Sequence, residues 1–166
     1  MLSSRAKYAT RALLDLALHY EQGPVSMQEI AARQNIPLKY LEQILLALKL
    51  RNVVASRKGP GGGYWLAHAP AEITLGTVVR AMDGPIAPIS CVSISGYHEC
   101  GCPEPETCGL RKVFKEARDA LASVLDQTTF ADILQRQQEG AVGLSTGSVE
   151  TGLPALIGDV PVPGAG

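Results

Sequence analysis

Four cysteines lie within residues 91–108, in a stretch broken by glycine and proline, and the rest of the sequence has none. A thiolate is a soft ligand, and several thiolates close together typically hold zinc or an iron–sulfur cluster. The residues alone leave three interpretations open: a 2Fe–2S or 4Fe–4S cluster, a zinc ion that staples the loop, or thiols that form a disulfide on oxidation. The four residues are Cys91, Cys100, Cys102 and Cys108.

The composition of the 166-residue chain suits one main domain with an extension, or two small lobes. Apolar residues make up 46% and aromatic residues only 5%, which predicts an aliphatic core. No apolar run reaches the roughly 18 residues that span a bilayer, and the first residues do not resemble a signal peptide. We therefore expect a cytoplasmic protein without a membrane partner, in a compartment where clustered cysteines favour metal or redox roles over structural disulfides.

Formal charge is distributed unevenly along the chain. Residues 1–60 contain nine Lys or Arg and four Asp or Glu, a net +5, whereas residues 61–166 contain six and twelve, a net −6. This asymmetry favours a polyanionic partner for the first half, although the cations can also simply solvate helix surfaces. We do not expect an enzyme, because no Ser/His/Asp constellation or carboxylate pair is evident and the three histidines are scattered.

Hydrophobic spacing predicts a helix over residues 4–20, a second from Ser26 to about Gln34, and a third that ends near Leu50. Ser26 and Glu29 have the spacing of a capping box, which marks the start of the second helix. Two short helices joined by a tight turn are typical of a helix-turn-helix. Any small helical bundle has a similar pattern, so the segment that follows is needed to distinguish a DNA-binding fold from another helical bundle.

A basic, glycine-rich hairpin is predicted after the third helix. Residues 53–56 and 64–67 have the composition of two short strands. Between them lie Arg57, Lys58 and the run Gly59-Pro60-Gly61-Gly62-Gly63, in which glycine lets the backbone approach a phosphate or a groove floor. The order of helix, helix and hairpin predicts a winged helix, against the plainer interpretation of a simple β-turn.

Three more helices are expected: from Thr74 to about Met82, from Cys108 to about Asp126, and from about Thr129 to Gln138. The middle one is long and amphipathic, so it either packs on its own domain or pairs with a copy of itself. Its apolar stripe comprises Leu110, Val113, Phe114, Ala117, Leu121, Val124 and Leu125. The charges expected to cover its remaining surface are Arg111, Lys112, Lys115, Glu116, Arg118 and Asp119.

The expected fold class is mainly α with a small β-wing: a winged helix-turn-helix DNA-binding domain plus a long dimerisation helix. We expect a DNA-binding domain over residues 1–83 and a cysteine-bearing sensor loop over 84–107. The dimerisation helix and a short last helix should occupy 108–139. Residues 140–166, rich in glycine and proline, are expected to form a disordered tail.

Four motifs resemble those of the IscR/NsrR-type winged-helix regulators, the Rrf-two family. They are Leu2–Ala17, Ile36–Ile44, Gly59–Tyr64 and Glu72–Leu75, in that order, and the resemblance covers about residues 1–135. It implies a dimeric bacterial transcription regulator that binds double-stranded DNA. It also implies an iron–sulfur cluster held by three cysteines after the winged helix, which would sense redox, iron or nitric oxide status.

The resemblance implies that Tyr40, Glu42 and Gln43 of the recognition helix face the major groove. There Gln suits a bidentate contact with adenine, and Glu accepts from cytosine N4. The wing should lie over the minor groove. Family members often have Arg before the Gly-Pro-Gly-Gly-Gly run; this place holds Lys58, so either Arg57 substitutes or the wing contributes charge more than readout. The residues expected to contact DNA are Ser3, Arg5, Arg11, Ser26, Lys39, Tyr40, Glu42, Gln43, Arg57, Lys58, Gly59, Pro60, Gly61 and Gly62. The first three should contact phosphates, which position the protein without specifying sequence.

Three of the cysteines correspond to cluster ligands of the family, and the fourth ligand is open. Family members use a His three residues after the last cysteine, or a carboxylate from the first helix of the partner subunit. Here these places hold Arg111 and Lys7, which stay protonated at neutral pH. Cys100 is the expected substitute and would complete a four-thiolate site, with His98 as the second candidate. The three corresponding cysteines are Cys91, Cys102 and Cys108.

Overall fold

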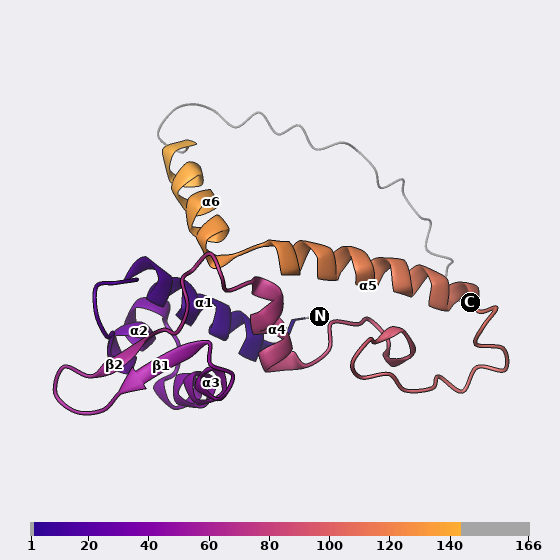
Figure 1. The fold of residues 1–166 in the computed structure, drawn as a ribbon, viewed down its shortest axis with the longest axis horizontal. Coiled ribbons are helices and arrows are strands. Elements are labelled where there is room, and N and C mark those ends of the chain that lie inside the picture. Colours follow the sequence, from indigo (N-terminus) through magenta and orange to yellow (C-terminus); the bar gives the residue numbers. More distant parts are fainter. Residues whose placement is uncertain (1, 144–166) are drawn as a thin grey trace, which may run out of the picture.

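Helix α1 (Ser4–Leu18) lies at the centre of the structure, a computed structural model that describes residues 2–143 (Figure 1). It packs against α2, α3, α4, α6 and strand β2. Within the described residues the architecture is six α-helices and one two-stranded antiparallel sheet. This arrangement confirms the predicted mainly α fold with a small β-hairpin.

The two helices of the predicted helix-turn-helix are α2 (Met27–Gln34) and α3 (Leu38–Leu50). The predicted capping box is present: Ser26 Oγ accepts from the backbone N–H of Glu29 at 3.2 Å, and Glu29 Oε2 accepts from the backbone N–H of Ser26 at 3.0 Å. Helix α2 ends at Asn35, whose left-handed backbone (φ 48°) turns the chain toward α3. The local signals at both ends of α2 therefore set the position of α3.

The hairpin consists of β1 (Val54–Arg57) and β2 (Gly63–Leu66), each shifted by one residue from the predicted strands. The turn between them requires glycine, because a Cβ at Gly62 would collide with the backbone oxygen of Arg57. Gly62 N donates to Gly59 O at 2.9 Å and closes the turn. The paired residues are Val54–Leu66, Ala55–Trp65, Ser56–Tyr64 and Arg57–Gly63.

After the hairpin, α4 (Leu75–Asp83) returns the chain to α1, and residues 84–108 form a long loop. The loop contains only a short 3-10 turn, η1 (Ser90–Val92). Helix α5 (Gly109–Gln127) runs from the end of this loop back to the body of the protein. In Figure 1 the loop leaves α4, runs outward beside α5 and joins the outer end of that helix.

Helix α6 (Phe130–Gly143) is longer than predicted, because the periodic pattern ends near Gln138 while the helix continues. Residues 140–143, expected to belong to the tail, are therefore helical. The rest of the predicted tail, residues 144–166, lies outside the described residues. In the part of the chain that is described, none of the helices combines the length and the apolarity that crossing a membrane requires.

The hydrophobic core is shared by α1, α2, α3, the hairpin and α4, and α6 adds one large side chain to it. Phe130 of α6 is fully buried, which explains why the last helix docks on the body. Aliphatic residues fill the rest, as the low aromatic content predicts. The largest buried aliphatic side chains are Leu13, Leu16, Ile30, Leu41, Ile44, Leu45, Leu48, Val54 and Val78.

The apolar stripe predicted on α5 divides between two faces. Leu125 is buried and Phe114 half-buried, on the face that packs against α4 and η1. The remaining large members are solvent-exposed in the single chain, with Val113 and Val124 exposed to 61% and 62%. An apolar strip of this kind along one helix needs a cover that the single chain does not provide within residues 2–143.

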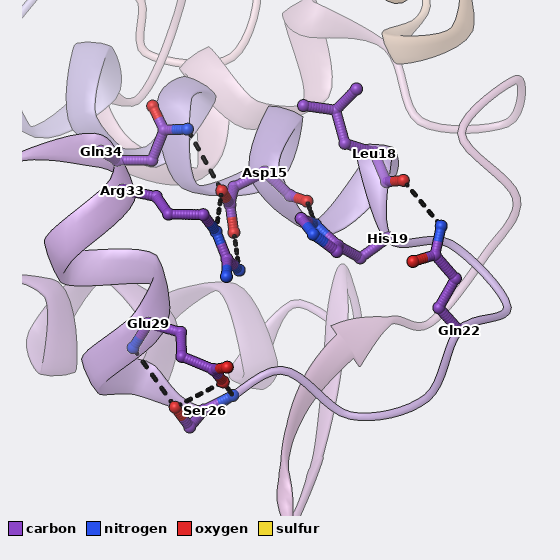
Figure 2. A network of polar contacts seen from close by, with 8 residues as sticks. All are labelled: Asp15, Leu18, His19, Gln22, Ser26, Glu29, Arg33 and Gln34. Atoms are coloured by element: carbon purple, nitrogen blue, oxygen red, sulfur yellow. Dashed lines mark hydrogen bonds and ion pairs between the residues drawn. The ribbon is translucent and has the colours of Figure 1, made fainter.

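A buried carboxylate joins α1 to α2 (Figure 2). Asp15 is only 1% exposed and accepts from Arg33 Nε at 2.9 Å and Arg33 Nη2 at 2.8 Å. Gln34 Nε2 adds a third donor at 3.2 Å. The hydrogen bond to Asp15 raises the pKa of Arg33, which therefore stays charged. This network fixes the position of α2 relative to α1.

Replacing Arg33 with alanine is expected to destabilise the fold by about 2–4 kcal/mol, because the charge of Asp15 would remain buried with Gln34 as its main donor. Urea unfolding followed by circular dichroism measures the change. The matched control is Arg51→Ala, which removes an exposed cation at the end of α3 and should cost less than about 0.5 kcal/mol. Equal losses in the two variants would show that Asp15 does not depend on Arg33.

Candidate nucleic-acid interface and cysteine site

The first turns of α3 present the predicted base-reading residues on one exposed face. Lys39, Glu42 and Gln43 are solvent-exposed, whereas the intervening Leu41 is fully buried. Tyr40 is half-buried, and its ring packs edge-on against Tyr8 of α1 at 5.7 Å between centroids. The sequence reasoning missed this Tyr8–Tyr40 contact, which fixes the rotation of α3 relative to α1.

Two of the three predicted phosphate contacts near the N-terminus, Ser3 and Arg11, also make hydrogen bonds within the protein. The Ser3 hydroxyl caps α1 by accepting from Ala6 N at 3.1 Å, and it donates to Asp83. Ser3 N also donates to Asp83 Oδ2 at 2.8 Å, so the chain start is joined to the end of α4. Arg11 donates to the carbonyl of Gln34, while Arg5 is half-buried with no ion pair among the described residues.

Two other predicted DNA contacts also make internal hydrogen bonds. The Ser26 hydroxyl donates to Glu29 Oε2 at 2.7 Å within the capping box. Arg57 Nη2 donates to Gly61 O at 3.1 Å and braces the wing loop. Lys58 is exposed and makes no ion pair within residues 2–143. Lys58 is therefore the wing cation that extends toward solvent in this structure, together with the exposed turn residues Gly59, Pro60 and Gly61.

The four cysteines differ in exposure and all are free thiols. Cys91 is buried in η1, Cys100 is exposed, and Cys102 is half-buried in the loop. Cys108 is half-buried at the start of α5. The structure thus distributes the predicted ligands over the whole loop, from its only regular turn to the first residue before the long helix.

The thiols affect one another's ionisation. Hydrogen bonding by Cys102, and to a smaller extent by Cys91, lowers the pKa of the Cys100 thiol. The hydrogen bond with Cys100, together with burial, raises the pKa of Cys102 to about 11. Burial, followed by the charge of Cys100, raises the pKa of Cys91. Cys108 interacts with Cys102 through its charge. The ionisation of Cys100 is therefore linked to that of Cys102 and Cys91.

The donor set fits a thiolate-bound metal centre, but the side chains are not yet gathered around one point. Among the described residues, no three His, Cys, Asp or Glu side chains form a group arranged to hold a metal ion. The thiols are linked through their ionisation: hydrogen bonding by Cys102 and, to a smaller extent, by Cys91 favours the thiolate of Cys100 and lowers its pKa. A metal or cluster would thus have to draw the loop together on binding.

Arg111, which occupies the place of a family ligand, holds the loop instead. Its Nε donates to Cys91 O at 3.3 Å and its Nη1 to Pro105 O at 3.4 Å. Arg118 was expected on the solvent-facing surface of α5, and this prediction is wrong: it is only 9% exposed and donates to Val92 O. Its burial is stabilised by that carbonyl and by the ion pair with Asp119. Two arginines thus fasten the cysteine loop to α5.

The other end of α5 is fastened to the body of the protein. Arg80 of α4 forms a bidentate ion pair with Asp126, with distances of 2.5 and 2.8 Å. The chain packs so closely here that a Cβ at Gly76 would collide with the Asp126 carboxylate. Leu75 N also donates to Thr128 O at 2.9 Å. Helix α5 therefore connects the cysteine loop to α4, which packs on α1 and α3.

Comparison with known proteins gives one consistent result. The family model described as Rrf2, an iron-dependent transcriptional regulator, matches residues 2–136. An rrf2-like HTH-type transcriptional regulator of Rhodobacter capsulatus is 40% identical over 138 residues, which cover 81% of this chain and 92% of the relative. The solved structure of CymR, the global cysteine regulator of B. subtilis, matches with a TM-score of 0.69 and 30% identity, covering 82% of this chain and 97% of CymR.

A second solved structure, T. potens IscR, matches with a TM-score of 0.68 and 31% identity, covering 84% of this chain and 90% of that one. The similarities confirm the expected fold class and the resemblance inferred from the four motifs. They also agree with the expectation of a regulator and not an enzyme, because the matched family regulates transcription.

Proposed function

Because the chain belongs to the Rrf2 family of transcriptional regulators, we propose that it is a dimeric, sequence-specific DNA-binding regulator whose cysteine loop holds an iron–sulfur cluster. The observation that supports the proposal is that side-chain contacts connect the cysteine loop to the winged helix through α5. The interacting thiols lie in a loop that Arg111 and Arg118 fasten to α5, and α5 is fastened to the winged helix through Arg80 and Asp126. The proposed segments are residues 1–83 for DNA binding, 84–107 for sensing and 108–139 for dimerisation.

The proposed DNA contact places the exposed face of α3 in the major groove and the wing over the minor groove. Glu42 and Gln43 are exposed there and have the acceptor and donor groups that read base edges. Lys58, in the turn of the wing, contacts a phosphate of the DNA backbone. Ser3, Ser26 and Arg11 support the interface from inside the protein, through the hydrogen bonds that fix the N-terminus, α2 and the turn before α3.

The proposed dimer forms through the exposed stripe of α5. Its members Leu110, Val113, Ala117, Leu121 and Val124 recur at the alternating spacing of three and four residues that is typical of paired helices. The adjoining face of α5 already packs on α4 and η1. A second copy of α5 is thus the partner whose chemistry and length match the stripe.

The proposed cluster ligands are four thiolates. Cys100 is the fourth ligand because it interacts with both Cys91 and Cys102, whereas Arg111 is committed to loop carbonyls. His98, the second candidate, is exposed. A bound cluster supplies a redox-active centre whose oxidation state responds to the surroundings.

One observation favours a second candidate function, a cluster-free thiol switch. Cys100 is exposed and its pKa is lowered, mainly by hydrogen bonding with Cys102, so a two-electron oxidant such as a peroxide would join Cys100 to Cys91 in a disulfide and take up the two electrons and two protons. Zinc is the third alternative, since four thiolates suit it equally well. With a cluster, a disulfide or zinc the loop would be drawn together, and without any of them it would be open.

Regulation in this proposal depends on the hydrogen bonds by which Arg111 and Arg118 hold the loop to α5. Drawing the thiols together moves η1 and the start of α5, because Arg111 and Arg118 hold the carbonyls of Cys91 and Val92. The two recognition helices of a dimer must meet half-sites about one turn of DNA apart, so a change in the tilt of α5 changes DNA affinity. The occupant acts only to the extent that it binds the two arrangements differently.

The test is to purify the full chain without oxygen and to record its visible spectrum with its iron, sulfide and zinc content. Visible absorption together with stoichiometric iron and sulfide is expected. DNA binding by the loaded, metal-free and oxidised forms is then compared on a duplex that the protein selects from a random pool. A colourless protein that contains zinc would indicate a zinc site, and a colourless protein without metal would indicate the thiol switch. Equal DNA binding by all forms would contradict regulation through the cysteine loop.

Two substitutions separate base reading from phosphate contact. Glu42→Ala should change the preferred base at one position by about 1–3 kcal/mol, measured by selection from a random pool. Lys58→Ala should leave the preferred sequence unchanged but lower the slope of log affinity against log salt by about one. Arg51→Ala, the matched control at the far end of α3, should change neither quantity. A base preference unaffected by Glu42→Ala would argue against the proposed orientation of α3.

A further inference from the structure

A cavity of about 330 Å³ lies between the cysteine loop and α5 and is lined mainly by positive charge. Its α5 wall consists of Arg111, Lys112, Lys115 and Arg118. The loop provides the facing wall, including Cys91, Tyr97 and Cys108. The volume lies in the range of cavities that hold small molecules.

The concentration of cations here is unusual for this half of the chain. Residues 61–166 contain six Lys or Arg against twelve Asp or Glu, and four of those six cations line this one cavity. Glu106 is the only carboxylate in the lining, and its side chain is 94% exposed at 3.7 Å from Arg111. A concave surface lined by one sign of charge focuses the electrostatic field and attracts the opposite charge.

The four cations have different tasks in the structure. Arg111 and Arg118 donate to loop carbonyls and pair with Glu106 and Asp119, so they shape the cavity while their charge is partly balanced. Lys112 and Lys115 are exposed and make no ion pair among the described residues, so their ammonium groups remain available to a ligand. Tyr97 closes one side, with the Arg111 guanidinium 6.0 Å from its ring centroid.

We propose that this cavity binds a small polyanion, a molecule with two or more phosphoryl or carboxylate groups. The cavity includes Cys91 and Cys108 in its lining but neither Cys100 nor Cys102, so it adjoins the proposed cluster site without coinciding with it. The inference does not require a cluster, because the cations and the cavity are present in this metal-free arrangement of the loop.

A bound polyanion would act on the same loop as the thiol site. It would bridge α5 and the loop next to the hydrogen bonds of Arg111 and Arg118. It would therefore favour the arrangement in which the loop is closed on the helix. Anion binding and thiol chemistry would then influence each other, because each changes the free energy of the same loop arrangement. The regulator would respond to a small anionic metabolite as well as to its thiol site.

The test uses the full chain, metal-free and with its thiols reduced, titrated with inorganic pyrophosphate and, separately, with citrate by isothermal calorimetry at constant ionic strength. Saturable binding of one or both is expected, and the stronger of the two identifies phosphoryl or carboxylate chemistry. Lys112→Gln/Lys115→Gln should weaken it by about tenfold or more. The control Lys7→Gln/Arg136→Gln removes the same charge from exposed positions elsewhere on the protein and should change the affinity by less than about twofold.

Alkylation of the cysteines locates the binding site. Saturating anion should slow the reaction of Cys108 with iodoacetamide at least about threefold, because Cys108 lines the cavity, and should leave exposed Cys100 unchanged. The proposal is overturned if neither anion binds saturably, if the two double variants weaken binding equally, or if Cys108 is not protected. None of these outcomes depends on whether a cluster or DNA binds.

Discussion

Glutamates at Val113 and Val124 are expected to leave the protein folded but monomeric, and to weaken its binding to a selected operator by about 10²- to 10⁴-fold. Both side chains are more than half exposed in the single chain, so the substitutions leave its core intact. In a dimer that pairs the exposed stripes, the same positions would bury several carboxylates of like charge. The monomer would retain one recognition helix and lose the gain that comes from joining two half-sites.

The measurement combines sedimentation velocity with a gel shift on the operator. The control variant is Ser123→Glu, which adds a carboxylate to the same helix at an exposed position outside the stripe. It should remain dimeric and bind DNA as the wild type does. A V113E/V124E protein that remains dimeric would show that another surface forms the dimer. A monomer that binds the operator with unchanged affinity would show that one recognition helix is sufficient.

The parts of the fold that could be predicted from the sequence are those with local causes. Ser26 and Glu29 mark the start of α2 because a capping box needs only four consecutive residues. The wing is predictable because Gly62 is required by the turn itself. The periodic burial of α3 separates Leu41 and Ile44 from the exposed Glu42 in the same way. In each case the physical reason lies within a few residues of the feature.

The features that could not be predicted depend on residues far apart in the chain. Ser3 is predicted to contact a phosphate, and the structure adds a hydrogen bond from its hydroxyl to Asp83, eighty residues away, that the sequence does not indicate. Arg118 reads as a surface charge because its helix is amphipathic, whereas the loop carbonyl of Val92 makes its burial favourable. Spacing on one helix does not reveal which other segment will cover it. The ties that connect the loop to α5 therefore emerge only from the three-dimensional structure.

The cysteine site shows the same division. The sequence places four soft ligands in one loop, and their types are sufficient to predict a metal, cluster or redox role. It does not show which thiols contact each other. The proposal favours Cys100 over His98 as the fourth ligand because it is a thiol whose pKa responds to Cys102 and Cys91. It also explains the arginine at position 111, which holds the carbonyls of Cys91 and Pro105.

Replacing Cys102 with serine is expected to abolish the visible absorption of the anaerobically purified protein and to remove essentially all of its iron and sulfide. A neutral hydroxyl cannot replace a thiolate as a cluster ligand at neutral pH. Cys100→Ser should have an effect of the same order if Cys100 is the fourth ligand, with iron lowered by about tenfold or more. His98→Ala is the matched control for that position and should retain the spectrum and the iron of the wild type.

The pattern across the three variants determines the fourth ligand. Loss of the cluster in Cys100→Ser with retention in His98→Ala supports a four-thiolate site, and the reverse pattern assigns the place to His98. DNA binding adds the functional consequence. Because Arg111 and Arg118 hold the carbonyls of the loop and not its thiols, the cluster-free variants should fold and dimerise as the wild type does. They should bind the selected operator as the metal-free wild type does, whether the cluster is added or withheld. A Cys102→Ser protein that binds DNA as the loaded wild type does would mean that the cluster, if present, does not control the recognition helices.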